Sequence, residues 1–135
     1  MSAESAAEVK QLIQQLSNTW LEERIDDLPP FFDEQVVLVT PDGDEINGRE
    51  QMIDSFALFM RLATVYHFEI ENIDVKLFET TAIARYTFEI DYEISDKRSL
   101  ESGIETLVLL QGTAGWRIVW RTQQHAPKSM EIEML

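Results

Sequence analysis

The side chains that could do chemistry in this chain are carboxylates and histidines. Its 135 residues include no cysteine, which excludes a thiolate nucleophile, a disulfide framework and a structural zinc site of the cysteine type. His67, one of two histidines, lies two residues before Glu69, and a histidine beside a carboxylate could act as a general base. The alternative is a hydrogen-bonded structural residue at a strand edge. His125, close to Pro127, is expected to be exposed.

A second group of polar side chains alternates along one predicted strand. It consists of Arg85, Thr87, Glu89, Asp91 and Glu93. Side chains two residues apart on a strand are separated by roughly 6.5–7 Å, so the carboxylates could converge only on a shared ion or on cross-strand partners. We favour a solvated or dimer-facing stripe and expect no metal site. The sequence also lacks a P-loop, a dinucleotide fingerprint, a zincin motif and a serine-nucleophile elbow, so no cofactor is expected.

Composition limits the classes of partner. The chain has 11 basic and 25 acidic residues, a net charge of −14 with neutral histidines. Nucleic acids and anionic membranes are disfavoured, because their phosphates would be repelled. The N-terminus has neither the basic region nor the apolar run of a secretory signal, and no stretch reaches the roughly 18 apolar residues of a membrane span. We therefore predict a soluble, cytoplasmic protein, with residues 1–135 forming a single domain.

The first half of the chain predicts three helical segments and a hairpin. Two segments have the three- and four-residue apolar spacing of an amphipathic helix. The buried face of the first would consist of Val9, Leu12, Ile13, Leu16 and Trp20. That of the other would consist of Met52, Ile53, Phe56, Met60 and Ala63. A shorter helical turn is predicted at 27–32, and a β-hairpin at 36–46, closed by Asp42-Gly43.

From residue 65 the apolar period becomes two, which predicts a four-stranded antiparallel meander. Its strands lie near 65–77, 82–94, 100–111 and 116–123. The apolar phase shifts at Glu71-Asn72, which indicates a β-bulge and a bend. Residues 127–135 are expected to form a flexible tail. This order of elements predicts an α+β cone, with three N-terminal helices packed on a strongly curved, mostly antiparallel sheet.

Three stretches carry a resemblance to a known family. They are FFDE at 31–34 leading into VVLVTPDG at 36–43, INGRE at 46–50, and GWRIVWR at 115–121. Together with the order of elements they resemble the NTF2-like superfamily, in particular its SnoaL-like and ketosteroid-isomerase-like branches. The resemblance spans roughly residues 9–124. It is more specific for fold than for function, because this fold carries enzymes, binding modules and assembly domains.

The resemblance implies a conical pocket between sheet and helices, and a convex sheet face that supports a homodimer. Ketosteroid isomerases use a tyrosine on the first helix, an aspartate base at the end of the first hairpin strand, and a protonated acid on a later strand. Leu16 and Thr40 occupy the first two positions in this chain. Leucine cannot donate a hydrogen bond and threonine is not a base near neutral pH, so steroid isomerase activity is not expected.

The third position, Glu105, is retained in kind. Strand alternation places it on the same face as Leu107 and Leu109, and a carboxyl with apolar neighbours could serve as acid, base or hydrogen-bond donor. The alternative is an exposed or ion-paired glutamate. If the pocket binds a ligand, we expect its walls to include four aromatic residues, although core packing is the alternative. These are Trp20, Phe56, Tyr86 and Trp120.

Two functions remain open at this stage, as does the question of whether the protein is an enzyme. The first is binding of a small hydrophobic molecule in the cone, with isomerase, cyclase or hydrolase chemistry at Glu105. The second is a non-catalytic dimerisation or association module. An open cavity with converging polar groups would favour the first function. A cavity filled by Phe31, Phe56 and Phe88 would favour the second.

Overall fold

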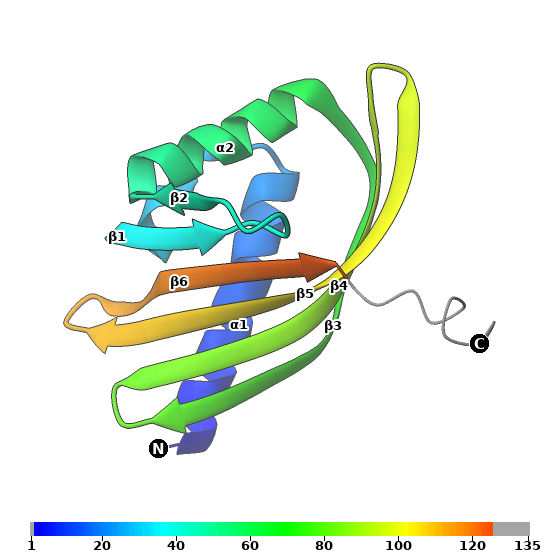
Figure 1. The fold of residues 1–135 in the computed structure, drawn as a ribbon. Helices are drawn as coiled ribbons and strands as arrows, with labels where there is room; N and C mark the ends of the chain where they lie inside the picture. The colour runs from blue at the N-terminus through cyan, green and yellow to red at the C-terminus, as the bar shows by residue number, and fades with distance from the viewer. Residues whose placement is uncertain (1, 126–135) are drawn as a thin grey trace.

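A computed structural model describes residues 2–125, so the tail predicted at 127–135 lies outside the described residues (Figure 1). The elements in chain order are α1 (Ser2–Leu21), η1 (Ile25–Asp27), η2 (Pro29–Phe31), β1 (Phe32–Val39), β2 (Glu45–Asn47), α2 (Arg49–Leu62), β3 (Ala63–Phe78), β4 (Thr81–Ile94), β5 (Lys97–Gly112) and β6 (Gly115–His125). Neither α1 nor α2 has the length and apolar character that a membrane-spanning helix needs.

The three predicted helical segments are present, with one difference in type. The stretch between α1 and β1 forms two single 3-10 turns, η1 and η2, in place of a short α-helix. Pro29 and Pro30 have no amide hydrogen to donate, so the chain cannot continue regular helical bonding there. The turns bring Phe32 to the start of β1, where its side chain is fully buried.

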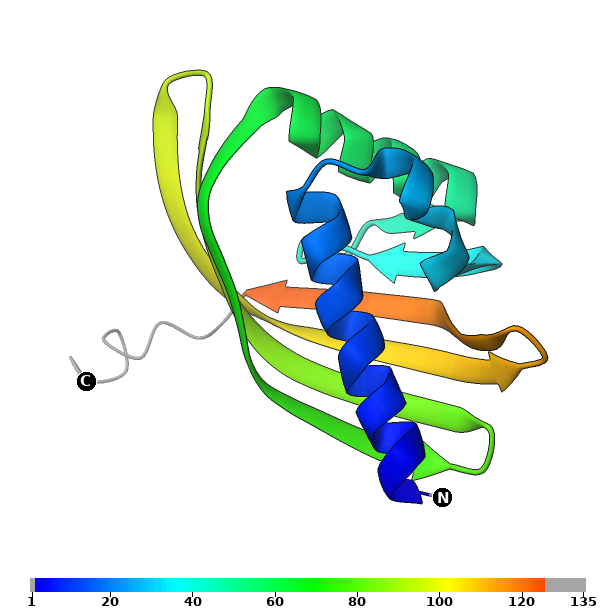
Figure 2. The same cartoon turned by 180° about the vertical axis from the view of Figure 1, so that it is seen from behind.

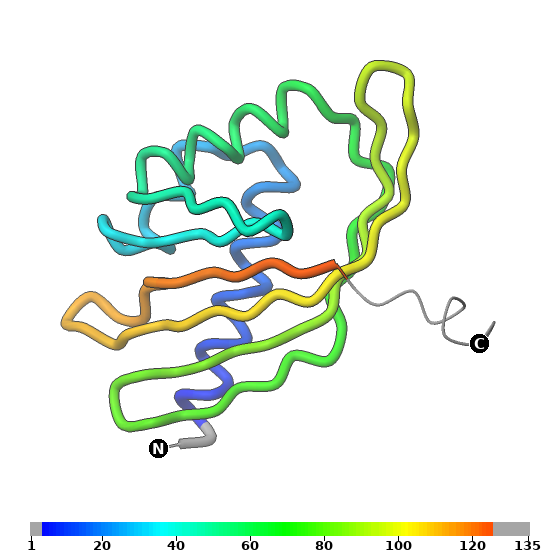
Figure 3. The backbone as a smooth tube through the Cα atoms, viewed as in Figure 1, coloured from blue at the N-terminus to red at the C-terminus, as the bar shows by residue number. Residues whose placement is uncertain are grey.

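The six strands form one mixed sheet in the order β2-β1-β6-β5-β4-β3. The predicted meander from β3 to β6 is antiparallel throughout, and β1 pairs in parallel with β6. The register shift between Glu71 and Asp74, with Asn72 at a φ of 59°, confirms the predicted bulge. The sheet is strongly curved, and the β4–β5 hairpin curls toward the C-terminal end of α2 (Figures 1 and 3).

Both helices lie against the concave side of this sheet. Figure 2 shows α1 crossing the strands. In the same view α2 lies near the edge of the sheet that β2 and β1 form. Alternate residues of the strands face the helices, so the inner row of β4 is buried at Ala82, Ala84, Tyr86 and Ile90 and half-buried at its other positions. The fully buried side chains come from both layers and include Ile13, Phe32, Met52, Leu107 and Ile118.

Candidate functional site

A cavity of about 320 Å³ lies between the helices and the concave face of the sheet. Its apolar wall is mostly aromatic and is formed by Leu16, Trp20, Leu38, Phe56, Phe59, Phe68, Tyr86, Phe88, Ile90 and Tyr92. Pro41 and His125 line it and are exposed, so the cavity opens between the β1–β2 turn and the end of β6. The cone is therefore open and is not filled by Phe56 and Phe88, which form part of its wall.

Glu105 lies on the inner face of β5 and is the centre of a hydrogen-bond network. Only 4% of the residue is exposed. Its Oε1 accepts a hydrogen bond from the Tyr86 hydroxyl on the neighbouring strand. Its Oε2 accepts from Arg121 Nε at 2.6 Å and from Gln123 Nε2 at 3.0 Å. The expectation of apolar neighbours along β5 is correct, but across the strands three polar donors surround the carboxylate.

The placement of Arg121 depends on a β-bulge in β6. Trp116 and Ile118 are buried on the inner face, and unbroken alternation would put residue 120 there as well. The register shifts opposite Val108 and Leu109, however, so that Trp120 pairs with Val108. One extra residue inverts every following side chain. The bulge thus turns Arg121 and Gln123 into the cavity, and their position could not be read from the apolar pattern.

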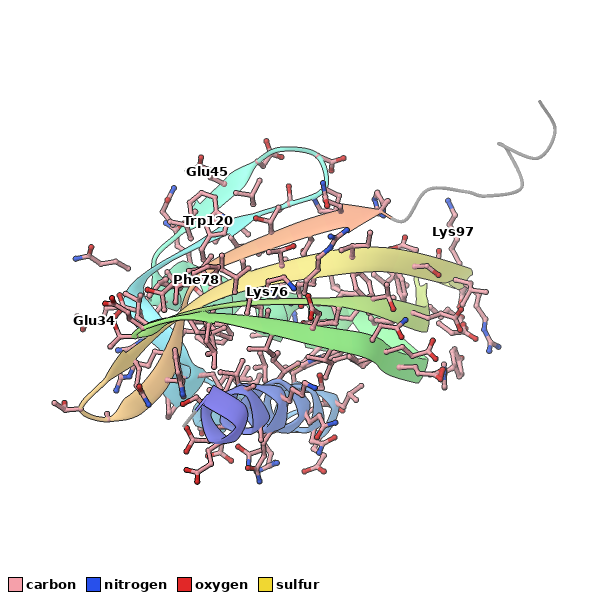
Figure 4. The ribbon with its side chains drawn as sticks, turned by 90° about the horizontal axis from the view of Figure 1, so that it is seen from below. Glu34, Glu45, Lys76, Phe78, Lys97 and Trp120 are labelled. Carbon is pink, nitrogen blue, oxygen red and sulfur yellow. The ribbon has the colours of Figure 1, made fainter. Side chains whose placement is uncertain are left out.

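The same bulge places Trp120 outside the cavity, so its assignment as a pocket wall is corrected. Its side chain projects from the face of the sheet opposite α1 (Figure 4). The residue is 38% exposed, and its indole N–H donates to Thr122 Oγ1 at 2.6 Å. The other three predicted wall residues, Trp20, Phe56 and Tyr86, do line the cavity together with Glu105.

Arg121 is itself a buried cation. Its side chain is 11% exposed, and its guanidinium carbon lies 4.9 Å from the centre of the Phe56 ring. This stacking and the ion pair with Glu105 hold the guanidinium from two sides. Among the described residues, only Nε of Arg121 has a hydrogen-bond partner. Its two terminal amino groups therefore have no hydrogen-bond partner in the described part of the chain.

A second carboxylate, Glu101, lines the outer part of the cavity with His125. Glu101 Oε2 accepts a hydrogen bond from the Tyr92 hydroxyl at 2.8 Å. Burial, and then this hydrogen bond to a carboxylate, raise the pKa of Tyr92 above its ordinary value, so the phenol stays protonated and keeps donating. His125 is exposed as predicted, but it belongs to β6 and lies in the cavity wall.

His67 does not belong to this site. It is exposed on β3 and is not among the residues that line the cavity, and its Nε2 lies 3.4 Å from Glu69 Oε1. Within the described residues, the group that could hold a metal ion consists of His67, Glu69 and Glu89, whose ligand atoms lie within 4.8 Å of one another. All three are exposed. His67 therefore lies outside the cavity, and its contact with Glu69 agrees with the structural alternative, whereas its role as a general base stays a prediction.

The two isomerase positions offer no replacement chemistry. Leu16 lines the cavity with an apolar side chain. The Thr40 hydroxyl accepts a hydrogen bond from the Asp44 amide at 3.2 Å, which closes the β1–β2 turn. Of the three positions that the resemblance implies, Glu105 is therefore the one with an ionisable side chain in the cavity wall.

Gly103 has no side chain, and this allows the Phe88 ring of the cavity wall and the backbone of β6 to pack directly against β5. A Cβ at this position would lie 2.5 Å from the Phe88 ring and 2.6 Å from the carbonyl oxygen of Gln124. We expect Gly103→Ala to lower the free energy of unfolding by about 1–3 kcal/mol, because the ring and the backbone of β6 must both move. Gly112→Ala on the same strand meets no atom within 4 Å and is the matched control. Urea denaturation measures both, and equal stabilities would contradict the prediction.

Comparison with known proteins relates most of the chain to one family. The sequence model of the family described as a SnoaL-like domain matches residues 9–126. No curated protein sequence matches the chain. An NTF2-like superfamily protein from Salmonella enterica serovar Typhimurium is 15% identical, with a TM-score of 0.82 over 96% of either chain. A protein with a cystatin-like fold from Caulobacter vibrioides is 18% identical, with a TM-score of 0.81 over 96% of this chain and 95% of that one.

An NTF2-like protein from Cytophaga hutchinsonii is similar in the same way. It is 10% identical, with a TM-score of 0.77 over 87% of this chain and 95% of that chain. At such identities the likeness of solved structures shows the fold alone. The predicted α+β cone is confirmed by these comparisons and by the sheet topology.

Proposed function

The chain belongs to the SnoaL-like family of NTF2-like proteins, and from this premise we propose that it binds a small hydrophobic molecule in the cavity of its cone. The observation that carries the proposal is the buried pair of Glu105 and Arg121 on the wall of an otherwise aromatic cavity. A buried ion pair adds little to stability compared with apolar residues of similar size. Its presence beside open space is typical of a binding or catalytic site.

Glu105 is the residue through which we expect any proton transfer to pass. A carboxylate can accept about four hydrogen bonds. Oε2 already accepts two, from Arg121 and Gln123, whereas Oε1 accepts one, from Tyr86. The remaining lone pair of Oε1 is therefore the acceptor site left for a ligand proton. This arrangement supports acid–base chemistry of the kind used by isomerases, cyclases and hydrolases.

The binding proposal is tested by filling the cavity. N-phenyl-1-naphthylamine is an uncharged, apolar dye whose fluorescence rises in apolar surroundings, and we expect saturable binding of one dye per chain. Ser17 is half-buried and lines the cavity, whereas its neighbour Asn18 is exposed on α1. Ser17→Phe should weaken dye binding at least tenfold, because the ring occupies the cavity, and Asn18→Phe should leave it unchanged. Equal binding by both variants would place the dye elsewhere and reject the proposal.

A second candidate function, association through the sheet, has an observation of its own. Three apolar residues on the outer face form a row across neighbouring strands, because Ile83 pairs with Val108 and Val108 pairs with Trp120. Ile83 and Trp120 are each 38% exposed. Exposed apolar rows favour contact with another surface, and we expect a homodimer through this face. Light scattering that gives only the 15.6 kDa mass of one chain at high concentration would reject it.

A further inference from the structure

The unused donors of Arg121 restrict what the cavity can bind. Its guanidinium is held by Phe56 and by Glu105, so it cannot turn away from an incoming molecule without losing both contacts. Among the described residues its terminal amino groups have no hydrogen-bond partner. Because the cavity is open, water can reach these amino groups when no ligand is bound. A ligand without an acceptor would remove that water and leave charged donors unsatisfied, which weakens binding by about tenfold or more.

The charges around the cavity decide the kind of acceptor. The charged groups in its wall are Glu101, Glu105 and Arg121, with His125 at the mouth. With the histidine neutral these groups sum to −1, and the whole chain carries −14. Arg121 is already neutralised by Glu105 at 2.6 Å. An anionic ligand would add a further negative charge to a guanidinium that has its counter-ion, in a chain that repels anions.

We infer that the ligand is an uncharged, mainly apolar molecule with one carbonyl-type acceptor, and that the terminal amino groups of Arg121 bind this acceptor. The inference rests on the proposed binding function and names its ligand class. The planar fork of arginine suits a carbonyl oxygen, which can accept two hydrogen bonds. In this arrangement Oε2 of Glu105 holds the Arg121 guanidinium in place for the bound carbonyl. Oε1 of the same carboxylate bonds Tyr86 and keeps its remaining lone pair for a ligand proton.

Four naphthalenes of similar size test the inference, each measured by displacement of N-phenyl-1-naphthylamine from the wild-type chain. They are 2-acetylnaphthalene, 2-ethylnaphthalene, 2-naphthoate and 2-naphthylmethylammonium. We expect the ketone to bind at least tenfold more tightly than each of the other three. Tighter binding of the carboxylate or the ammonium compound, or equal binding of the ketone and the hydrocarbon, would overturn the inference while the binding function stands. Failure of the dye and all four compounds to bind would reject both.

A conservative variant separates ligand contact from a structural role. Arg121→Lys keeps a cation beside Glu105 but loses the planar fork. We expect it to weaken binding of 2-acetylnaphthalene about tenfold and to leave binding of 2-ethylnaphthalene unchanged. Arg85→Lys on the exposed face of β4 is the matched control and should change neither. A loss that is equal for ketone and hydrocarbon would show that Arg121 only maintains the shape of the cavity, and would overturn the inference.

Discussion

Replacing Glu105 with alanine is expected to lower the free energy of unfolding by about 3–5 kcal/mol. The loss has two sources. The Arg121 guanidinium, whose side chain is 11% exposed, would keep its charge without a counter-ion. The Tyr86 hydroxyl and the Gln123 amide would also lose the acceptor that they share. Urea denaturation at neutral pH, followed by circular dichroism, measures this change.

Two further variants identify the cause of that loss. Glu105→Gln removes the charge and replaces one acceptor oxygen with an amide donor, but it keeps an acceptor oxygen for Arg121. We therefore expect its free energy of unfolding to fall less than that of the alanine variant. The double variant Glu105→Met with Arg121→Met removes both charges and keeps most of the volume. It should be more stable than Glu105→Ala, because no unpaired charge remains in the cavity wall. A loss below about 1 kcal/mol in Glu105→Ala would mean that the ion pair is not held in the folded state.

The fold was largely predictable because its signals are local. Period-two alternation along 82–94 identified the inner row of β4, and the phase shift at Glu71-Asn72 identified a bulge. The parallel pairing of β1 with β6 joins residues that are far apart in the sequence, such as Val37 and Trp120, which are separated by 83 positions. No local pattern encodes such a contact, so the order of elements predicted the antiparallel meander but not the parallel pairing of β1 with β6.

The candidate site was only partly predictable, for a related reason. Glu105 could be found because strand alternation and the family pattern indicate the same face. Arg121 could not, because the β6 bulge reverses the alternation that starts at Trp116 and Ile118. Unlike the bulge in β3, this one leaves no clear break in the apolar pattern, since Val119 and Trp120 are both apolar. An apolar side chain can lie on the buried or on the exposed face of a sheet. The sequence of apolar residues in β6 therefore does not show that the side chains change face after Ile118.

Trp20→Ala is expected to lower the free energy of unfolding by about 3–5 kcal/mol. Trp20 is 8% exposed and lies at the centre of an aromatic cluster in the cavity wall. Its ring is 4.9 Å from Phe68, 6.2 Å from Phe59 and 6.5 Å from Phe56, measured between ring centres, and the first two contacts are edge-to-face. Alanine would remove these contacts and join the vacated space to the existing cavity, so the core could not collapse onto it.

Trp120→Ala is the matched control, because the two tryptophans are equivalent in the sequence-based prediction and lie on opposite faces of the sheet in the structure. Trp120 is 38% exposed, so only part of its side chain packs against other residues. Its replacement by alanine should lower the free energy of unfolding by about 1 kcal/mol or less. If the protein is a dimer through the outer face, Trp120→Ala should also shift the dimer toward monomer, whereas Trp20→Ala should not. Equal losses of unfolding free energy in the two variants, measured at a concentration where both are monomeric, would contradict the β6 bulge and with it the position of Arg121.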